Sequence, residues 1–162
     1  MFHVILAGGS GSRFWPKSRQ NNPKQMLNIL GDDTMICLTY KRLRKIADTD
    51  SILVVASHKL IKLIQKQIPE IPQKNYIIEP SEKNTAPAIG LAALHILNRD
   101  KNAIMGIYPA DHMITGDEQF QSVITKARKM VEKESVLMTI GIKPTYPALG
   151  YGYIKYDTMN KS

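Results

Sequence analysis

Hydrophobic and polar residues follow one another along the chain in blocks that predict strands and helices in alternation. Short apolar runs with no polar interruption are typical of strands buried on both faces. Such a run predicts a strand of this kind at residues 2–7. Further strands are predicted at 51–56, 75–78, 103–108 and 136–142, and another over 151–156. Apolar residues at helical spacing predict helices at 34–46, 58–68, 86–98 and 117–133. This alternation predicts an α/β fold, with a mostly parallel sheet and helices on both faces.

Residues that start or stop helices mark several of these boundaries. Asp32 or Asp33 is available as N-cap of the first helix, and Thr85 as N-cap of the third. Pro69 and Pro72 follow the second helix and are expected to end it. Because no internal repeat, linker or low-complexity segment divides the chain, we expect residues 1–162 to form one unit without a second domain.

Composition narrows the class of protein. Hydrophobic residues make up 43% of the 162 residues and charged residues 22%, a balance typical of a globular protein with a core. The single cysteine, Cys37, excludes an intramolecular disulfide bond and fits a reducing compartment. No apolar stretch has the length of a membrane-spanning helix, so we expect a cytoplasmic protein with no membrane partner.

The net charge of +8 indicates anionic partners, although a solvated basic surface is the alternative for most of the lysines. Nucleic acid is disfavoured as a partner, because aromatic residues are only 7% of the chain and no helix-turn-helix, zinc-ligand or aromatic RNA-binding pattern occurs. A small phosphorylated substrate fits a basic site as well.

The stretch LAGGSGSRFWPKSRQNNPKQ, which follows the first predicted strand, has the chemistry of a phosphate site. Gly8, Gly9 and Gly11 allow backbone N–H groups to approach a phosphate closely. The guanidinium of Arg13 can bind two phosphate oxygens, and Lys24 follows a conformationally restricted proline. The alternative is a tight strand-to-helix turn with incidental basic residues.

This loop fits neither of two common phosphate motifs. A dinucleotide-binding GxGxxG pattern needs glycine where Phe14 stands, and a P-loop needs glycine before Lys17-Ser18, where Pro16 stands. We interpret Trp15 as a packing anchor behind the loop. The loop follows the first strand and the stretch PADH follows the fourth, so that both are expected at the same carboxyl edge of the sheet.

Four stretches of the sequence together resemble one enzyme family. In chain order they are LAGGSGSRFWPKSR with the following PKQ, EPSEKNTAPAIGLAA, PADH and GYGYI. They resemble the motifs of the sugar-nucleotide pyrophosphorylases, in the version that is similar to the bacterial mannose-1-phosphate guanylyltransferases. The resemblance implies a Rossmann-like nucleotidyltransferase fold and transfer of GMP from GTP to mannose 1-phosphate, which gives GDP-mannose and pyrophosphate.

The resemblance also implies roles for single residues. Arg13 would contact the phosphates and Lys24 the α-phosphate or the sugar phosphate, which makes both candidate catalytic residues. Asp111 is the candidate ligand of a Mg²⁺ cofactor, because Mg²⁺ takes one or two carboxylates beside phosphate oxygens; a turn cap is the alternative. The implied nucleotide-binding residues are Leu6, Ala7, Gly8, Gly9, Ser10, Gly11, Ser12, Arg13, Glu79, Pro80, Asn84, Thr85 and Ala86.

Two further stretches, EPSEKNTAPAIGLAA and GYGYI, are the candidates for recognition of the base and of the sugar. Guanine presents N–H donors on one edge, and we hypothesise that Glu79 accepts them. Asn84 and Thr85 would bond the base or ribose, with helix capping as the alternative. The implied sugar-phosphate residues are Lys24, Gly150, Tyr151 and Gly152, with a plain β-bulge as the alternative for the two glycines.

Two departures from the family pattern keep other readings open. Ala148-Leu149 stands where the family has Glu-Thr, which puts sugar recognition in question. Family members also continue well beyond residue 162, so we expect this chain to be the nucleotide-binding N-terminal part of the domain. The alternatives are a GTP-binding but inactive fragment or relic, and a related pyrophosphorylase for another base or sugar. A homo-oligomer formed through exposed apolar surface is a further expectation.

Overall fold

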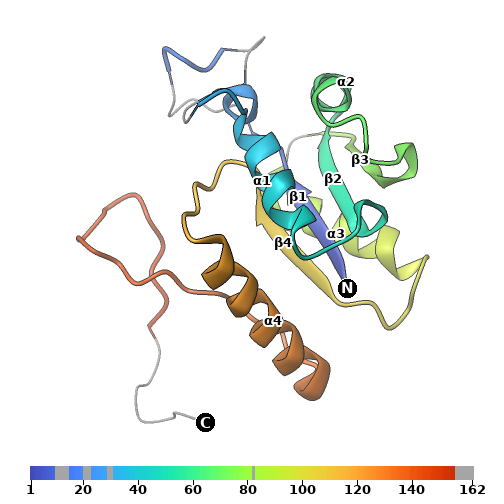
Figure 1. The fold of residues 1–162 in the computed structure, drawn as a ribbon, viewed down its shortest axis with the longest axis vertical. Helices are drawn as coiled ribbons and strands as arrows, with labels where there is room; N and C mark the ends of the chain where they lie inside the picture. Colours follow the sequence, from blue (N-terminus) through green and yellow to red (C-terminus); the bar gives the residue numbers. More distant parts are fainter. Residues whose placement is uncertain (10–14, 20–22, 29–30, 82, 156–162) are drawn as a thin grey trace.

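Four parallel strands form the centre of the molecule (Figure 1). The computed structural model describes residues 1–9, 15–19, 23–28, 31–81 and 83–155. The strands are β1 (Phe2–Leu6), β2 (Ile52–Ser57), β3 (Tyr76–Glu79) and β4 (Met105–Pro109), and their order in the sheet is β3-β2-β1-β4. This order matches the first four of the six strands, 3-2-1-4, of the doubly wound, Rossmann-like arrangement.

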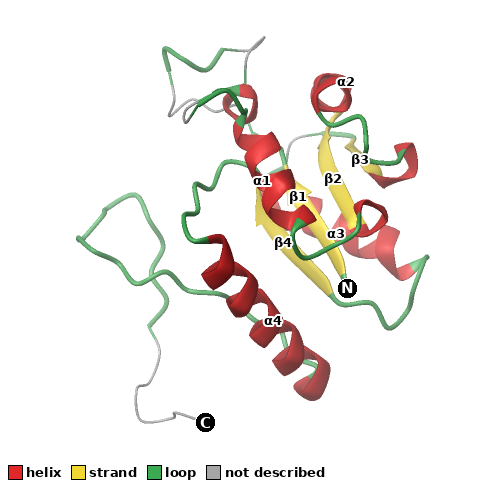
Figure 2. Ribbon diagram, in the orientation of Figure 1, coloured by secondary structure: helices red, strands yellow, loops and turns green. Residues whose placement is uncertain are grey.

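Helices cover both faces of this sheet, as the alternation of strand and helix predicts (Figure 2). Three of them, α1 (Met35–Arg44), α2 (His58–Gln67) and α4 (Asp117–Glu134), contribute to the apolar core on one face. The core on the opposite face is closed by α3 (Thr85–Leu97). Three short 3₁₀ turns complete the regular structure of the described residues: η2 (Lys24–Met26), η3 (Thr49–Ser51) and η4 (Gln73–Asn75).

The uninterrupted apolar runs are explained by these two cores. Successive residues of β1 point to opposite faces of the sheet, and both faces are covered. Val4 packs in the core under α3 and Ile5 in the core under the other helices, and both are fully buried. The same division separates Leu53 from Val54 in β2. The prediction that the first strand is covered on both faces is confirmed, and strands also form within or close to the next three predicted ranges.

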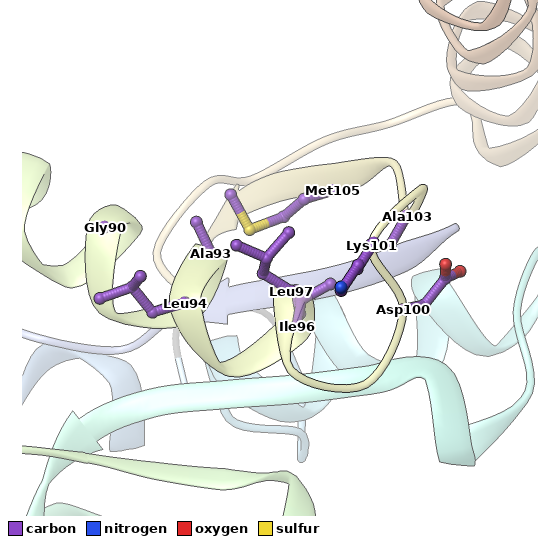
Figure 3. Close-up of a pocket in the computed structure, with 9 residues that line it drawn as sticks. All are labelled: Gly90, Ala93, Leu94, Ile96, Leu97, Asp100, Lys101, Ala103 and Met105. Atoms are coloured by element: carbon purple, nitrogen blue, oxygen red, sulfur yellow. The ribbon is translucent and has the colours of Figure 1, made fainter.

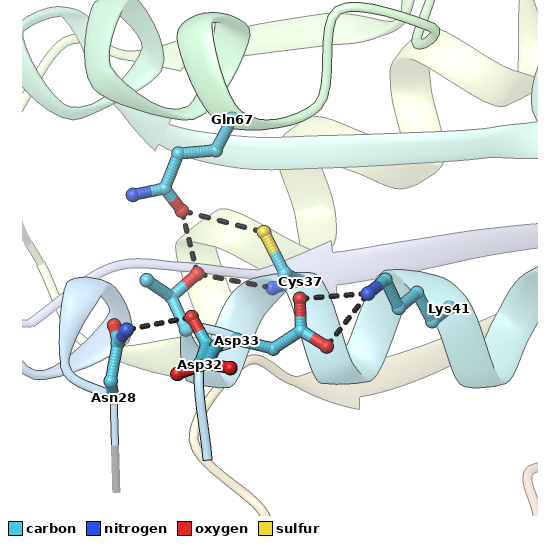
Figure 4. A network of polar contacts seen from close by, with 7 residues as sticks. Asn28, Asp32, Asp33, Cys37, Lys41 and Gln67 are labelled. Carbon is cyan, nitrogen blue, oxygen red and sulfur yellow. Dashed lines mark hydrogen bonds and ion pairs between the residues drawn. The ribbon is translucent and has the colours of Figure 1, made fainter. Parts of the chain in front are cut away.

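The first helix begins at Met35, one residue after the predicted start at Thr34, and its cap differs from both predicted caps (Figure 4). Thr34, and not Asp32 or Asp33, is the N-cap, and its hydroxyl oxygen accepts a hydrogen bond from the backbone N–H of Cys37. The same hydroxyl donates to Gln67 at the end of α2, with 2.6 Å between the oxygens. Asp33 instead pairs with Lys41, eight residues further along the chain. A contact with another helix therefore selects the cap.

The cap predicted for the third helix is also displaced by one residue. Helix α3 begins at Thr85, and Asn84 occupies the N-cap position with a positive φ of 66°. Asn84 forms no side-chain capping hydrogen bond. The backbone geometry at the end of the preceding loop therefore places the helix start, because asparagine tolerates a positive φ better than threonine does.

The prediction of a strand at residues 136–142 is wrong. The described residues from 135 to 155 contain no strand, and Leu137 and Ile142 are largely exposed. An apolar run becomes a strand only where another strand satisfies its backbone N–H and C=O groups. No strand of the described chain pairs with this segment. The strand expected from 151 is likewise absent up to residue 155, and residue 156 lies outside the described residues.

None of the helices in the described part of the chain is both long and apolar enough to cross a lipid bilayer.

A buried histidine ties β1 to β4 within the core. His3 is 4% exposed, its Nδ1 lies 3.0 Å from the hydroxyl oxygen of Tyr108, and the two rings are stacked. Burial, with smaller contributions from the N-terminal amine and Arg128, lowers the pKa of His3 from 6.5 to about 4. The folded protein therefore holds this imidazole neutral where the unfolded chain begins to protonate it.

Acid should destabilise the protein through His3. As the pH falls from about 6.5 to about 4, the unfolded state binds a proton that the folded state does not, so the free energy of unfolding falls. The fall should reach ~3 kcal/mol, since one pKa unit is worth ~1.4 kcal/mol. Urea denaturation at about pH 7.5 and about pH 4.5 should show a smaller fall for H3Q than for wild type.

The exposed His95 of α3 supplies the matched control, and H95Q should follow wild type at both pH values. An equal fall for wild type and H3Q would assign the acid sensitivity to other groups.

Candidate functional site

The carboxyl ends of β1 and β4 lie side by side at the point where the strand order reverses. From β1 the chain proceeds to β2 and β3 on one side, and it then crosses to β4 on the other side of β1. In sheets of this kind, ligands bind in the crevice beyond the strand ends at this position. Ala110 continues the pairing, because its N–H donates to the carbonyl of Leu6 at 2.9 Å. The prediction that the two loops share one edge is confirmed.

The first loop leaves β1 through a buried alanine and two glycines. The N–H of Ala7 donates to the carbonyl of Val55 at 2.9 Å, which extends the sheet by one residue. A Cβ added to Gly8 would lie 3.1 Å from a carboxylate oxygen of Glu79, and Gly9 has a positive φ of 97°. Glycine thus allows the loop to pass close to Glu79 and to turn. Ser10, Gly11, Ser12 and Arg13 lie outside the described residues, so their roles stay predictions.

The turn η2 contacts the loop after β1 through the side chain of Gln25. Gln25 is 1% exposed, and its side-chain N–H₂ donates to the carbonyl of Gly8 at 2.7 Å and more weakly to that of Gly9 at 3.4 Å. Its side-chain oxygen is buried and has no hydrogen-bond partner within the described part of the chain. Gln25 stands within the PKQ motif, but the motif predicts no role for it. A glutamine between Lys24 and Met26 carries no signal for a partner that lies 17 residues earlier.

Lys24 and Asp111 meet across the site. The Lys24 ammonium donates to a carboxylate oxygen of Asp111 and forms an ion pair with it, although 87 residues separate the two in sequence. The two side chains are 22% and 23% exposed. The backbone before Asp111 is fixed, because the carbonyl of Ala110 accepts from the hydroxyl of Thr39 in α1 at 3.3 Å. The structure therefore brings Lys24, a predicted phosphate-site residue, into direct contact with Asp111, the predicted metal ligand.

Arg42 of α1 fixes the chain that follows Asp111. Its guanidinium donates to the carbonyl of Ile114 at 3.3 Å and lies 3.9 Å from the carboxylate of Asp117 at the start of α4. Burial lowers the pKa of Arg42, and the opposing charge of Asp117 offsets part of this effect. The guanidinium also faces the ring of Phe120. This arginine supports the loop and does not point to a ligand role of its own.

The predicted base-binding residues lie at the end of β3 and the start of α3. Glu79 is 9% exposed and lies beside Gly8, whereas Pro80, Asn84, Thr85 and Ala86 are exposed. The absence of a side-chain cap at Asn84 removes the alternative that this side chain serves α3 by capping. The four exposed residues are therefore accessible to a ligand, whereas Glu79 is nearly buried.

Two other predictions on site residues fare differently. Gly150, Tyr151 and Gly152 lie in the irregular, exposed segment that follows α4, and no helix or strand of the described residues includes them. Their sugar-phosphate role stays a prediction. The interpretation of Trp15 as a packing anchor is wrong, because 71% of Trp15 is exposed and Arg19 lies over its ring at 6.0 Å.

The described residues fit a divalent cation only in part. They contain no group of three or more His, Cys, Asp or Glu side chains that could hold a metal ion. Asp111 offers one partly exposed carboxylate at the strand ends. One carboxylate together with phosphate oxygens and water is a usual set of ligands for Mg²⁺. Asp111 therefore suits a Mg²⁺ ion that is also bound by a phosphorylated ligand.

An apolar groove of about 480 Å³ lies elsewhere, between α3 and the turn before β4 (Figure 3). Leu94 and Leu97 line it and are 63% and 51% exposed. Met105, also in its wall, is the first residue of β4, so that the groove lies toward the amino end of that strand. Its chemistry and its position separate it from the edge where Lys24 and Asp111 meet.

Known proteins resemble this chain over most of its length. It is 41% identical over 155 residues to a mannose-1-phosphate guanylyltransferase of Salmonella montevideo and 39% identical over 153 residues to the xanthan biosynthesis protein XanB of Xanthomonas campestris. It is 38% identical over 156 residues to the alginate biosynthesis protein AlgA of Pseudomonas aeruginosa. These matches cover 94–96% of this chain, which spans 32% of the length of each of these curated relatives.

Solved structures confirm the fold. A mannose-1-phosphate geranyltransferase of Thermus thermophilus matches 82% of this chain and 38% of its own, with a TM-score of 0.73 and 23% identity. A mannose-6-phosphate isomerase of Helicobacter pylori matches 81% of this chain and 46% of its own, with a TM-score of 0.62 and 27% identity. The Nucleotidyl transferase family itself matches residues 2–161, and the chain therefore belongs to that family.

Proposed function

We propose that the protein transfers GMP from GTP to mannose 1-phosphate and releases pyrophosphate. The observation that carries this proposal is the meeting of Lys24 and Asp111 at the reversal of strand order, beside a glycine loop held by Gln25. A cation, a carboxylate and exposed backbone suit a ligand that is rich in phosphate. The names of the relatives supply the mannose and the guanine. Since this chain spans only part of those relatives, the reaction of the whole protein is the subject of the proposal.

The proposed reaction needs position and charge rather than a covalent intermediate. An oxygen of the sugar phosphate attacks the α-phosphorus of GTP in line, and a new P–O bond forms. The bond between the α-phosphorus and the oxygen that bridges it to the β-phosphorus breaks, and pyrophosphate leaves. The loop from Gly8 would hold the phosphates with its backbone N–H groups. Lys24 would neutralise the α-phosphate or the incoming sugar phosphate, and Arg13 the leaving pyrophosphate.

Asp111 would be the protein ligand of Mg²⁺. When bound, the ion would offset the charge of the phosphate oxygens and help to orient them. The protein would contribute one carboxylate at a fixed position. The hydrogen bonds of Ala110 with Leu6 and Thr39 fix that position.

Glu79 is the residue that we propose for selection of guanine. Its carboxylate is nearly buried next to Gly8, so the acceptor stands where the loop would carry the nucleotide. Acceptors opposite the N–H groups of guanine favour this base over bases that lack those donors. Asn84 and Thr85 are exposed nearby in sequence for contacts with the base or ribose.

One observation favours a second candidate function, binding of GTP without turnover. The predicted sugar-phosphate residues Gly150, Tyr151 and Gly152 lie in the exposed, irregular segment after α4 and belong to no helix or strand of the described residues. A nucleotide site without its sugar side would bind GTP and release no pyrophosphate.

The cytoplasmic location, the exclusion of nucleic acid as a partner and the homo-oligomer stay predictions.

Pyrophosphate release tests the transfer. With GTP, mannose 1-phosphate and Mg²⁺, the wild-type chain should release pyrophosphate, and R13A and D111N should each lower the rate by ~10²–10³-fold, because R13A loses a cation that faces the phosphates and D111N loses the carboxylate that would hold Mg²⁺. D48N is the matched control for Asp111, since its side chain is fully exposed, and it should keep the wild-type rate. GTP binding without release in wild type would favour the second candidate function.

Base selection should depend on Glu79. Because E79Q replaces one acceptor with an amide donor, its preference for GTP over ATP and UTP in a binding titration should fall by roughly tenfold or more. E70Q, which changes an exposed glutamate, should keep the preference of wild type. An E79Q protein that retains the full preference would remove Glu79 from the base site.

Gln25 should matter for nucleotide binding although it need not touch the nucleotide. Q25L leaves the Gly8 carbonyl without its donor and frees the loop, so that the Kd for GTP should rise by roughly tenfold. Q65L, on the exposed side of α2, should bind GTP as wild type does. Calorimetric titration measures both, and an unchanged Kd for Q25L would show that the loop keeps its shape without this contact.

A further inference from the structure

The candidate metal ligand Asp111 is already engaged by a cation of the protein itself. The Lys24 ammonium is bound to one of its carboxylate oxygens. In the part of the chain that the structure describes, neither residue is in an ion pair with any other side chain. The pair is less than a quarter exposed, so that solvent screens it less than it screens a surface pair. The two charges therefore neutralise each other at the centre of the site.

The backbones on both sides of this pair are fixed. Lys24 stands between Pro23 and the buried Gln25, which is bonded to the glycine loop. Asp111 follows Ala110, whose N–H and carbonyl are both hydrogen bonded. The lysine side chain, in contrast, is a flexible four-carbon stem that ends in a point charge with three donors. It can change partner while the frame of the site stays in place.

We propose that Lys24 is a resident counter-ion of Asp111 that exchanges partners when a phosphate and a divalent cation bind together. The inference rests on the proposed function, which places both ligands at this edge. In the exchange, the ammonium leaves the carboxylate for a phosphate oxygen, and the released carboxylate becomes a ligand of the divalent cation. Each ligand thereby removes the competitor of the other.

This exchange makes the two binding events cooperative. A cation that binds alone must displace Lys24 without giving it a new partner, and a phosphate that binds alone must draw Lys24 away and leave Asp111 without a counter-ion. When both bind, every charge has a partner. The coupling is reciprocal, since two ligands that assist each other do so by the same factor. A merely structural ion pair would instead affect stability and leave the affinities unchanged.

Manganese binding in the absence of nucleotide tests one half of the exchange. Mn²⁺ would serve as the probe, and electron paramagnetic resonance would measure the concentration of free Mn²⁺ in separate titrations. The proteins to be titrated are wild type, K24M, K24M/D111N and K17M. K24M should bind Mn²⁺ about tenfold more tightly than wild type, because Asp111 no longer has its competitor. The gain should vanish in K24M/D111N, and K17M, which removes an exposed lysine, should behave as wild type.

Pyrophosphate binding in the presence of EDTA tests the other half. D111N releases Lys24, so that calorimetry should show metal-free pyrophosphate bound about tenfold more tightly than by wild type. The loss of a negative charge alone also favours an anion, and the comparison of K24M with K24M/D111N measures that effect. The gain in the Lys24 background should exceed it.

The proposal is overturned if K24M binds Mn²⁺ no more tightly than wild type, if its gain survives in K24M/D111N, or if D111N improves pyrophosphate binding equally with and without Lys24. Circular dichroism checks the fold of each variant, and K24Q replaces K24M if the latter is unfolded. Neither titration needs turnover. A chain that shows the exchange but releases no pyrophosphate from GTP would reject the proposed reaction alone, and an active chain without the exchange would reject this inference alone.

Discussion

The parallel pairing of β1 with β4 is the constraint on which the whole arrangement depends. Its register sets Leu6 opposite Pro109, so that the two strands end level and their loops leave the sheet side by side. A single backbone hydrogen bond contributes only ~1 kcal/mol. The pairing as a whole, however, also creates the two faces on which the apolar cores form, because β1 lies between β2 and β4 with its side chains buried on both sides. The site is thus a consequence of the same alignment that buries the core.

The turn η2 converts this alignment into a site. Two successive residues of the turn have different partners: Lys24 reaches Asp111 after β4, and Gln25 reaches the carbonyl of Gly8 after β1. Met26, the next residue, packs in the core and anchors the turn. One short segment therefore fixes the position of the glycine loop and carries the charge that faces the candidate metal ligand. A buried frame with one adjustable side chain is suited to ligands whose charge changes during a reaction.

Sequence reasoning succeeded where the determining contacts are repeated along a segment and failed where they are single and distant. Each apolar run that proved to be a strand has a partner, whereas the equally apolar residues around Leu137 have none. Thr34, and not one of the two neighbouring aspartates, is the cap because its hydroxyl also bonds Gln67, which is remote in sequence. The shared edge of Lys24 and Asp111 was predictable from topology, but their direct ion pair was not. Nor was Gln25, because a buried glutamine has no periodic pattern.

The distribution of charge gives the exchange of Lys24 a place in recognition. The net charge of +8 attracts anions from a distance, whatever their identity. At the site itself, the pair formed by Lys24 and Asp111 contributes no net charge, so that this attraction does not by itself produce tight binding of an anion. With the exchange proposed above, the lysine becomes available to an anion only when a divalent cation takes the carboxylate. General attraction and specific retention would then be separate steps, and only a phosphate that arrives with its metal would satisfy both.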